Sequence, residues 1–272
     1  MPAVAILDPK IVEAYQRDGA VCVRGLFTPE WVELTRRAID AILASPSELA
    51  IVASRPEDPG LFVEDFRNWQ RFPELEELIR RSPVAAVVGE LMSASVVRFY
   101  HDHVLVKERG TRQRTPWHQD QPYYDVDGTQ SCSMWMPVDP VSRASTLEFI
   151  AGSHRGPWYL PRTFLDGQAK WFPEGSMAEL PDIEGARGNF PIIGWELEPG
   201  DAVFFHFLTL HASAGVEGPH RRRVMSLRFL GDDIVHAPRP WRTSPPFPEL
   251  KDTLPAGAPM DHPLFPVLWR AG

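Results

Sequence analysis

Apolar positions in the N-terminal third of the chain recur at helical spacing, which predicts an outer layer of helices over about residues 8–93. Asp8 is placed to cap the first helix, Pro9 suits its first turn, and Gly19 ends it. Thr28 is expected to cap the second helix. The predicted helices, and one short β-rich run between the first two, cover residues 8–18, 20–24, 28 onward, 73–81 and 82–93.

From residue 96 onward the pattern changes to short, β-branched segments. The first, Val96 to Lys107, alternates along its length and is predicted as a strand that Gly110 ends. Several short strands with turn signals between them indicate a sandwich or barrel, here over about residues 96–232. The expected fold class is therefore mainly β with flanking helices (α+β). Further strands, separated by Gly, Pro and Asp, are predicted over residues 130–138, 146–150, 194–197, 202–208 and 223–230.

Proline-punctuated segments are predicted to lack long regular elements. The chain has 28 prolines, about twice the typical share of ~5%. Residues 45–59 are expected to form a loop, and the insert 154–193 to form loop and short helix. No linker or repeat divides the chain, so residues 1–272 are predicted to form a single domain. Residues 237–272 are expected as an extended arm over the barrel, anchored by Phe247, Phe265, Leu268 and Trp269.

Composition limits the possible partners. With 272 residues and 43% hydrophobic content the chain can bury one sizeable core. Its net charge of −8 argues against nucleic acid or an anionic membrane as a partner. No apolar run approaches the ~18 residues that span a bilayer, and the N-terminus lacks a signal-peptide pattern. Two cysteines, Cys22 and Cys132, provide no disulfide framework or thiolate zinc site, which suits a reducing, cytoplasmic setting. Nothing in the sequence indicates the oligomeric state.

The sequence Trp117-His118-Gln119-Asp120 carries the first chemical signal. Residues two apart in an extended strand point to the same face, so His118 and Asp120 are expected to lie together. An imidazole and a carboxylate are two of the three ligands of a 2-His-1-carboxylate iron site, which keeps positions open for other ligands. A third ligand is needed to turn this common pair into a metal site.

Two downstream histidines, His206 and His211, are candidates for that third ligand. His206 is predicted inside a strand between phenylalanines, where a structural role is expected. His211 follows, with small residues after it that leave room for a co-substrate. We therefore favour His211 as the third ligand.

Arg222 opens the predicted strand that follows His211. By strand parity Arg222, Ser226 and Arg228 share one face, and Met225, Leu227 and Phe229 share the other. An arginine fork pairs bidentately with a carboxylate, as the far end of an iron-chelating dicarboxylate requires. The neighbours Arg221 and Arg223 are expected in a solvated basic turn.

Together these segments resemble the phytanoyl-CoA dioxygenase family of Fe(II)/2-oxoglutarate oxygenases. The resemblance spans about residues 10–230 in the family's order. It is carried by Tyr15–Gly25, by Lys107–Gly110 with Thr115–Asp120, by Trp135–Asp139 with Leu147–His154, and by Gly200–Asp201 with His211, Ser213 and Arg222. The family's Asn after the distal histidine is absent, because Gly215-Val216-Glu217 stands there.

The resemblance implies a double-stranded β-helix, a jelly-roll or cupin-like barrel, with iron at its mouth. His118, Asp120 and His211 would bind Fe(II). 2-Oxoglutarate and O2 would complete the reaction, which releases succinate and CO2 and hydroxylates a substrate C–H bond. Halogenation is disfavoured because Asp120 occupies the position that chloride would need. The residues implied for 2-oxoglutarate are Arg222, Ser213, Trp135 and either His103 or Leu105.

The substrate is expected to be a small or mid-sized organic molecule, such as a secondary-metabolite intermediate. No dedicated phosphate cradle is visible, so a CoA thioester is not favoured. Arg228 and Arg67 are candidates for a substrate carboxylate, although Arg228 is equally suited to a buried pair with an acidic residue such as Asp232. Aromatic residues expected over the iron are Phe66, Trp69, Trp117, Tyr123 and Tyr124, with Trp158 and Trp171 from the insert.

Two alternatives remain open from the sequence. A cupin-like enzyme could use the same ligands for zinc or for non-oxidative chemistry, and it would not need Arg222. A degenerate barrel could bind a ligand without turnover, although the complete set of ligands argues against this.

Overall fold

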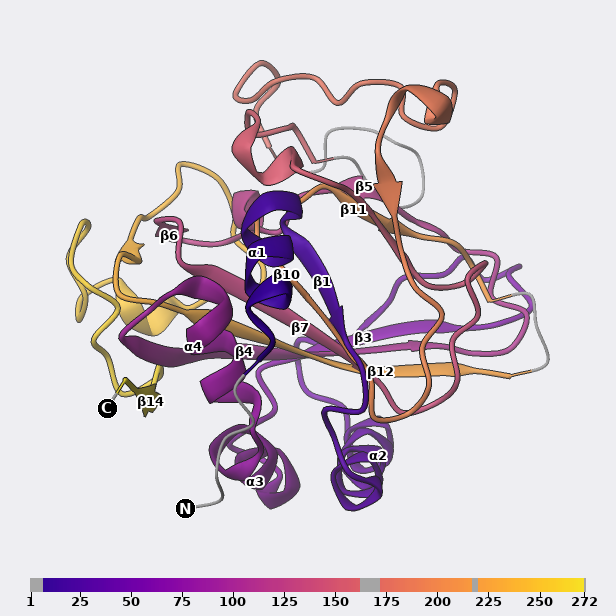
Figure 1. The fold of residues 1–272 in the computed structure, drawn as a ribbon, viewed down its shortest axis with the longest axis horizontal. Helices are drawn as coiled ribbons and strands as arrows, with labels where there is room; N and C mark the ends of the chain where they lie inside the picture. The colour runs from indigo at the N-terminus through magenta and orange to yellow at the C-terminus, as the bar shows by residue number, and fades with distance from the viewer. Residues whose placement is uncertain (1–6, 162–171, 217–219, 272) are drawn as a thin grey trace.

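The computed structural model describes residues 7–161, 172–216 and 220–271 (Figure 1). Two antiparallel sheets dominate this part of the chain, with helices packed on the outer face of the larger one. None of the described helices is long and apolar enough to cross a bilayer. Trp171, one of the aromatic residues expected over the iron, lies outside the described residues.

The larger sheet has eight strands in the order β1-β10-β7-β12-β4-β3-β2, and β14 also pairs with β4. All its pairings are antiparallel. The strands are β1 (Ala20–Val23), β2 (Ile51–Val52), β3 (Phe62–Phe66), β4 (Val96–Lys107), β7 (Ser131–Pro137), β10 (Ala202–Phe205), β12 (Arg222–Leu230) and β14 (Val267–Arg270).

The smaller sheet has four strands in the order β5-β11-β8-β9. Side chains of β8 pack against those of β7, β10 and β12, so the two sheets enclose a shared interior. These strands, and the two of a separate ribbon, are β5 (Thr115–His118), β8 (Leu147–Ile150), β9 (Ile192–Ile193) and β11 (His211–Ser213), with β6 (Val126–Asp127) and β13 (Val235–His236).

Four helices cover the outer face of the larger sheet. In Figure 1, α2 and α3 lie below this sheet while β5 and β11 lie above it. Met225, Leu227 and Phe229 of β12 belong to the core under the helices, as their strand parity predicts. The side chains on the opposite face of β12 therefore face the space between the two sheets. The helices are α1 (Pro9–Asp18), α2 (Pro29–Ala44), α3 (Pro73–Arg81) and α4 (Val84–Met92).

The ends of α1 form as the sequence predicts. The Asp8 carboxylate accepts a hydrogen bond from the Lys10 backbone N–H at 3.0 Å. Gly19 ends the helix at φ 76°, and a Cβ there would lie 2.4 Å from the His154 side chain, so both conformation and space require glycine. The predicted cap of α2 is wrong in one respect, because Thr28 makes no side-chain cap hydrogen bond. Its hydroxyl instead bonds to Glu30 and lowers the pKa of that carboxyl.

Several predicted strands differ in detail. Residues 194–197 form no strand; β9 lies just before them, and only Leu197 makes an isolated bridge, with Val141. The strand predicted over 202–208 ends at Phe205, because the chain turns there and the Thr209 N–H donates to the His206 carbonyl. The short strands β2 and β3 were not predicted, since neither carries a distinct alternating pattern.

The C-terminal arm packs as predicted and adds a strand. Phe247 and Phe265 are buried around Tyr100, and Leu268 and Trp269 pack on the core under the helices. The ring of Trp269 packs against Gly89 of α4, where a Cβ would lie 2.5 Å from that ring. β14 pairs with the beginning of β4, so the arm is tied to the strand whose other end reaches the cavity. The insert holds short helices, η2 (Ser153–Arg155) and η3 (Arg187–Asn189); η1 (Gln121–Tyr123) and η4 (Pro248–Leu250) lie outside it.

Candidate metal centre and co-substrate cavity

Two facing strands bring the two histidines together. His118 is the last residue of β5 and His211 the first of β11, and they are direct partners in the antiparallel register. Their ring centroids are 4.2 Å apart. Asp120 does not share a strand face with His118, as the sequence argument assumed, because the strand has already ended. It lies in a helical conformation (φ −76°, ψ −41°) at the start of η1, and this turn directs its carboxylate back to the histidines.

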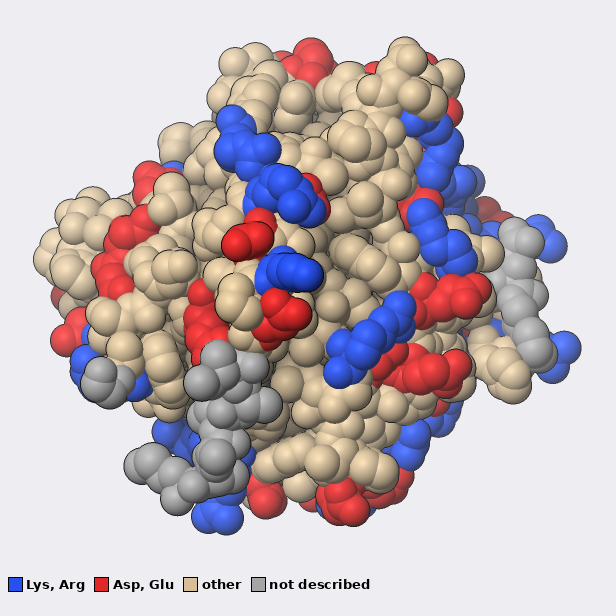
Figure 2. All heavy atoms as spheres, in the orientation of Figure 1, with Lys and Arg blue, Asp and Glu red and all other residues tan. Residues whose placement is uncertain are grey.

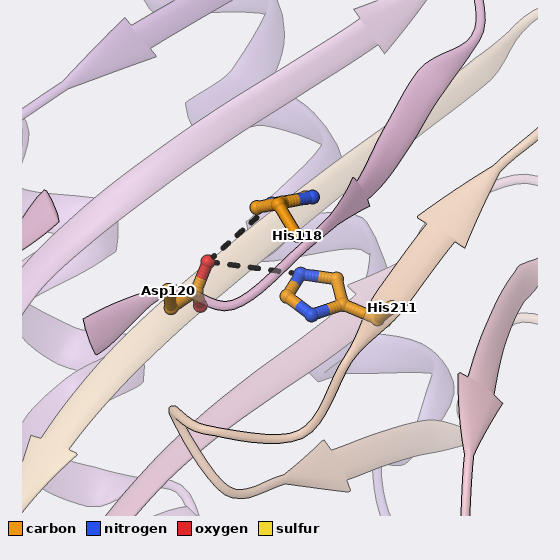
Figure 3. A group of neighbouring side chains, drawn as sticks. All are labelled: His118, Asp120 and His211. Atoms are coloured by element: carbon orange, nitrogen blue, oxygen red, sulfur yellow. Dashed lines mark ion pairs between the residues drawn. The ribbon is translucent and has the colours of Figure 1, made fainter. Parts of the chain in front are cut away.

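The three side chains converge from these two segments (Figure 3). Asp120 Oδ1 lies 3.7 Å from His118 Nε2 and 3.6 Å from His211 Nε2. One ligand atom from each residue lies within 4.8 Å of the others. His211 and Asp120 are buried, and His118 is partly buried. The spacing and the burial suit one small cation held on one side by protein.

Backbone carbonyls orient both imidazoles. His118 Nδ1 lies 2.8 Å from the Pro116 carbonyl, and His211 Nδ1 lies 2.9 Å from the Thr209 carbonyl. A carbonyl only accepts, so each Nδ1 carries the proton and each Nε2 directs a lone pair towards Asp120. Burial lowers the pKa of His211 and favours the neutral form that binds metals.

The two oxygens of Asp120 have different surroundings. Oδ2 accepts from Ser133 Oγ at 3.0 Å and lies 3.1 Å from Arg228 Nε, which leaves Oδ1 directed at the histidines. Burial would raise the pKa of this carboxyl, but Arg228 and the two histidines lower it below its usual range. Two neutral imidazoles and one ionised carboxylate are the donor set of a non-haem Fe(II) site, so the residues fit this metal.

Arg228 thus has a different partner from the one the sequence suggested. Its guanidinium pairs with Asp120 and donates to the Tyr124 hydroxyl at 2.9 Å. Asp232 lies elsewhere and accepts hydrogen bonds from Ser95. Arg228 points into the barrel as predicted, but its charge is matched by Asp120.

A cavity of about 380 Å³ opens beside the three side chains, between the two sheets. The residues expected around 2-oxoglutarate all line it: His103, Leu105, Trp135, Ser213 and Arg222. Four of the residues expected around a substrate also line it: Phe66, Tyr123, Tyr124 and Arg228.

Other residues expected near the substrate point elsewhere. Trp117 alternates with His118 along β5, so its ring packs on the opposite side and donates to Glu184 at 2.7 Å. Trp69 lies in the core under the helices, edge-on to Phe99.

Arg67 also turns away from the cavity. It adopts φ 59° directly after β3, and its guanidinium pairs with Glu249 of the arm at 2.7 Å. The ring centroid of Trp158, in the insert, lies 4.9 Å from the guanidinium carbon of Arg239, and Trp158 does not line the cavity.

Arg222 lines the cavity beside Ser213 and has unused hydrogen-bonding capacity. It donates to the Ser145 carbonyl, and its Nη2 lies 3.4 Å from Ser213 Oγ. Its Nε is buried and has no partner, and no carboxylate of the described residues pairs with it. Burial lowers its pKa to about 10. A buried cation without a counter-charge is costly, so this part of the cavity fits a carboxylate such as that of 2-oxoglutarate.

Lys107 is a residue of this site that the sequence reasoning missed. It is fully buried, and its Nζ lies 3.2 Å from Ser213 Oγ and 3.0 Å from the Ala214 carbonyl. Burial and the nearby Arg222 hold its pKa well below the usual value. Its strand parity, shared with His103 and Leu105, was the signal that could have placed it in the interior.

Arg223 corrects a further expectation. It was predicted in a solvated turn with Arg221, but it is buried and pairs with Asp139 at 2.8 Å and with Asp40 at 2.9 Å. Arg221 remains partly exposed beside Asp40. The alternation of β12 explains the difference, because Arg223 points to the helix side of the sheet.

The other candidate ligand, His206, lies away from the metal group. Its Nε2 donates to the Thr129 carbonyl at 2.7 Å, and its Nδ1 accepts from the Leu208 backbone N–H at 3.0 Å. Both ring nitrogens are thus engaged by the backbone, which is the structural role that the sequence suggested for it.

A profile of the phytanoyl-CoA dioxygenase (PhyH) family matches residues 15–224. The chain belongs to this family. A probable phytanoyl-CoA dioxygenase of Caenorhabditis elegans is 25% identical over 195 residues, which cover 69% of this chain and 60% of that protein. Dioxygenase FrzG of Cladobotryum sp is 24% identical over 244 residues, which cover 81% of this chain and 73% of that protein.

Solved structures share the fold over almost the whole chain. The non-haem alpha-ketoglutarate-dependent carbocyclase SnoK from nogalamycin biosynthesis has a TM-score of 0.76 at 22% identity, covering 98% of this chain and 99% of SnoK. The epimerase SnoN, in complex with Fe3+, alpha-ketoglutarate and nogalamycin RO, has a TM-score of 0.73 at 21% identity, covering 96% of this chain and 100% of SnoN. These likenesses confirm the predicted double-stranded β-helix.

Family membership also confirms the predicted enzyme class, an iron- and 2-oxoglutarate-dependent oxygenase, and with it the cofactors.

Proposed function

We propose that this protein is an Fe(II)- and 2-oxoglutarate-dependent dioxygenase that hydroxylates a C–H bond of a small or mid-sized organic substrate, with release of succinate and CO2. One observation carries the proposal. The metal-binding group and a buried arginine without a counter-charge, Arg222, line the same cavity. A site that only held a metal would have no use for that cation.

Each residue has a defined task in this proposal. His118, Asp120 and His211 would hold Fe(II) through two Nε2 atoms and Oδ1. Bound Fe(II) and 2-oxoglutarate supply oxygen activation by oxidative decarboxylation. Arg222 and Ser213 would hold the far carboxylate of the co-substrate, and so orient it towards the metal.

Further residues shape the space around the co-substrate. Trp135 lies under Arg222, with the guanidinium carbon 5.5 Å from its ring, and would limit how the guanidinium can turn. His103 and Leu105 would form the neighbouring wall. Because Trp135 and His103 are buried and Leu105 is partly buried, they would also exclude water from the reacting atoms.

The proposed substrate is an intermediate of secondary metabolism. In support, SnoK and SnoN, described as enzymes of nogalamycin biosynthesis, share the fold along their whole length. One is a carbocyclase and the other an epimerase, so product analysis must distinguish hydroxylation from ring formation or inversion. Relatives named for phytanoyl-CoA make an acyl-CoA thioester the competing substrate class.

A small molecule, rather than nucleic acid or membrane, is the proposed partner. On the face shown in Figure 2, acidic and basic side chains are interspersed. This distribution lacks the single-sign patch by which phosphate backbones are usually bound. The cytoplasm is our proposed location, because the chain carries free thiols at Cys22 and Cys132.

Anaerobic titration tests the assignment. Adding Fe(II) and then 2-oxoglutarate should produce the visible metal-to-ligand charge-transfer band of a chelated keto acid. With O2 and a substrate, succinate should form in step with the oxidised product. Fe(II) binding without the band would favour the cupin-like alternative. A band without turnover of any substrate would favour the ligand-binding barrel, and succinate release coupled only to acyl-CoA would contradict the proposed substrate class.

A further inference from the structure

The cavity holds one acidic side chain that neither the metal nor the co-substrate uses. Glu64 lies on β3, directly opposite Leu105 of β4, and its side chain lines the cavity. The residue is only 6% exposed. A carboxylate is rarely buried to this degree unless it is paired, so the partner of Glu64 decides its role.

Within the protein, Glu64 has no full counter-charge. Its neighbour is His103, whose Nε2 lies 3.2 Å from Oε1 without making a well-formed hydrogen bond. Burial lowers the pKa of His103 more than the nearby Glu64 raises it, and the ring of Phe66 stacks on the imidazole at 4.0 Å. No lysine or arginine of the described residues forms an ion pair with Glu64. The carboxylate therefore presents open acceptor positions to the cavity.

The basic groups of the cavity, by contrast, are committed. Arg228 is matched by Asp120 and donates to Tyr124. Arg222 lies beside Ser213, where the proposed function assigns it to 2-oxoglutarate. Among the described lining residues, no arginine or lysine remains for an anionic substrate. Of the two roles that the sequence left open for Arg228, the structure shows the buried pair, with Asp120 in place of Asp232.

The mouth of the cavity beside Glu64 is apolar. Ile51 and Val52 of β2 line it, and they are 47% and 59% exposed. Ile51 is the direct cross-strand partner of Glu64, so the two side chains lie next to each other on the same face. Large aliphatic side chains that are exposed at the mouth of a cavity mark a surface that a ligand covers.

From this arrangement we infer that the substrate is an apolar body bearing a hydrogen-bond donor, an amine or a hydroxyl, which Glu64 accepts. The apolar body lies against Ile51 and Val52. Glu64 is thus a substrate-binding residue that selects against carboxylates and phosphates by repulsion. The inference rests on the proposed function, because it takes Arg222 as the co-substrate's anchor.

Three probes with the same apolar body test the inference: 2-naphthylmethylamine, 2-naphthylmethanol and 2-naphthoate. Each is titrated anaerobically into protein already loaded with Fe(II) and 2-oxoglutarate, and binding is read from the probe's fluorescence. The amine or the alcohol should bind at least about ten-fold more tightly than the carboxylate. Comparing the amine with the alcohol shows which hydrogen-bond donor is preferred.

Two substitutions separate the acceptor from the apolar mouth. Glu64→Gln should weaken binding of the amine by at least about ten-fold, because it removes a charge-assisted hydrogen bond, and should not weaken binding of the carboxylate. Ile51→Ser should weaken all three probes alike, by about ten-fold or less. Glu77→Gln, at an exposed position of α3, is the matched control.

The visible band of each variant reports that it has folded and has taken up its cofactors. If the wild type gives no band, the proposed function fails. If the band forms, three results overturn the inference alone. These are naphthoate binding as tightly as the amine and the alcohol, Glu64→Gln binding the preferred probe as tightly as the wild type, and no binding of any probe at millimolar concentration.

Discussion

Lys107 of β4 and Arg222 of β12 are direct cross-strand partners, and both reach the hydroxyl of Ser213. Both are pure hydrogen-bond donors, so the Ser213 oxygen accepts from each of them and its own proton is left to donate elsewhere. Two buried basic side chains thus meet at one hydroxyl, and of the three groups Arg222 and Ser213 line the cavity. The Ser213 proton and the Arg222 guanidinium, whose Nε has no protein partner, are the donors that would meet the co-substrate carboxylate.

Replacing Lys107 with Met should lower the affinity for 2-oxoglutarate about ten-fold and leave the affinity for Fe(II) little changed. Lys107 acts through Ser213 and the Ala214 carbonyl, so it is a positioning residue. The dissociation constants of 2-oxoglutarate, from the visible band, and of Fe(II), from competition with a chelator, measure the two effects separately. Lys251→Met, at an exposed position, is the control. Equal loss of both affinities would mean that Lys107 serves only the fold.

Arg222→Ala should raise the 2-oxoglutarate KM about 100-fold, because a bidentate, charge-assisted contact is lost. Arg222→Lys keeps the charge but loses the forked guanidinium, so its KM for 2-oxoglutarate should lie between those of Arg222→Ala and the wild type. Arg221→Ala removes a neighbouring, partly exposed arginine and provides the control. An unchanged KM in Arg222→Ala would remove the co-substrate assignment and favour a metal enzyme of another class.

Arg228→Met should lower Fe(II) affinity about 10- to 100-fold, because Asp120 loses the cation that orients its second oxygen. Ser133→Ala removes the other donor to the same oxygen and should have a smaller effect, since that donor is neutral. The Fe(II) dissociation constants of both variants can be measured by competition with a chelator, without any substrate. A larger loss in Ser133→Ala than in Arg228→Met would contradict this order.

His206 should make the metal-free protein sensitive to acid. Burial lowers its pKa to about 4, below the ~6.5 of an unfolded chain. A lowered histidine pKa contributes stability that is complete above pH ~6.5 and is lost as the pH falls towards 4, by about 3 kcal/mol in total.

Urea unfolding of the metal-free protein between pH 7 and pH 4.5 measures this loss. His206→Gln should flatten the pH dependence of the unfolding free energy over this range, and His220→Gln, at an exposed site, should not. A steep acid limb that persists in His206→Gln would assign the sensitivity to other buried groups.

Periodicity in the sequence predicted much of this architecture. The parity of β12 correctly placed Arg222, Ser226 and Arg228 in the interior and Met225 and Phe229 under the helices. This worked because a long strand between two packed layers must alternate, whatever its partners are. The same rule, applied across the end of β5, failed for Asp120, whose position depends on a turn.

What the sequence could not provide are contacts made across the fold. The pairing of Arg228 with Asp120 joins residues far apart in the chain, and nothing in the order of residues favours Asp120 over Asp232. Glu64 was missed for a related reason. β3 is short and both its faces are largely buried, so its polar and apolar residues do not alternate by burial.

The carbonyl of Phe207 accepts hydrogen bonds from the backbone N–H groups of both Asp120 and Gln121, at 2.8 and 3.2 Å. Gln119 reinforces this junction by donating to the Leu208 carbonyl at 2.9 Å. The turn that carries Asp120 is therefore fastened to the loop that leads into His211. Local opening of either segment displaces the carboxylate and the imidazole together. The coordination sphere is thus gained and lost as a cooperative unit, and an ion that holds one segment in place also orders the other.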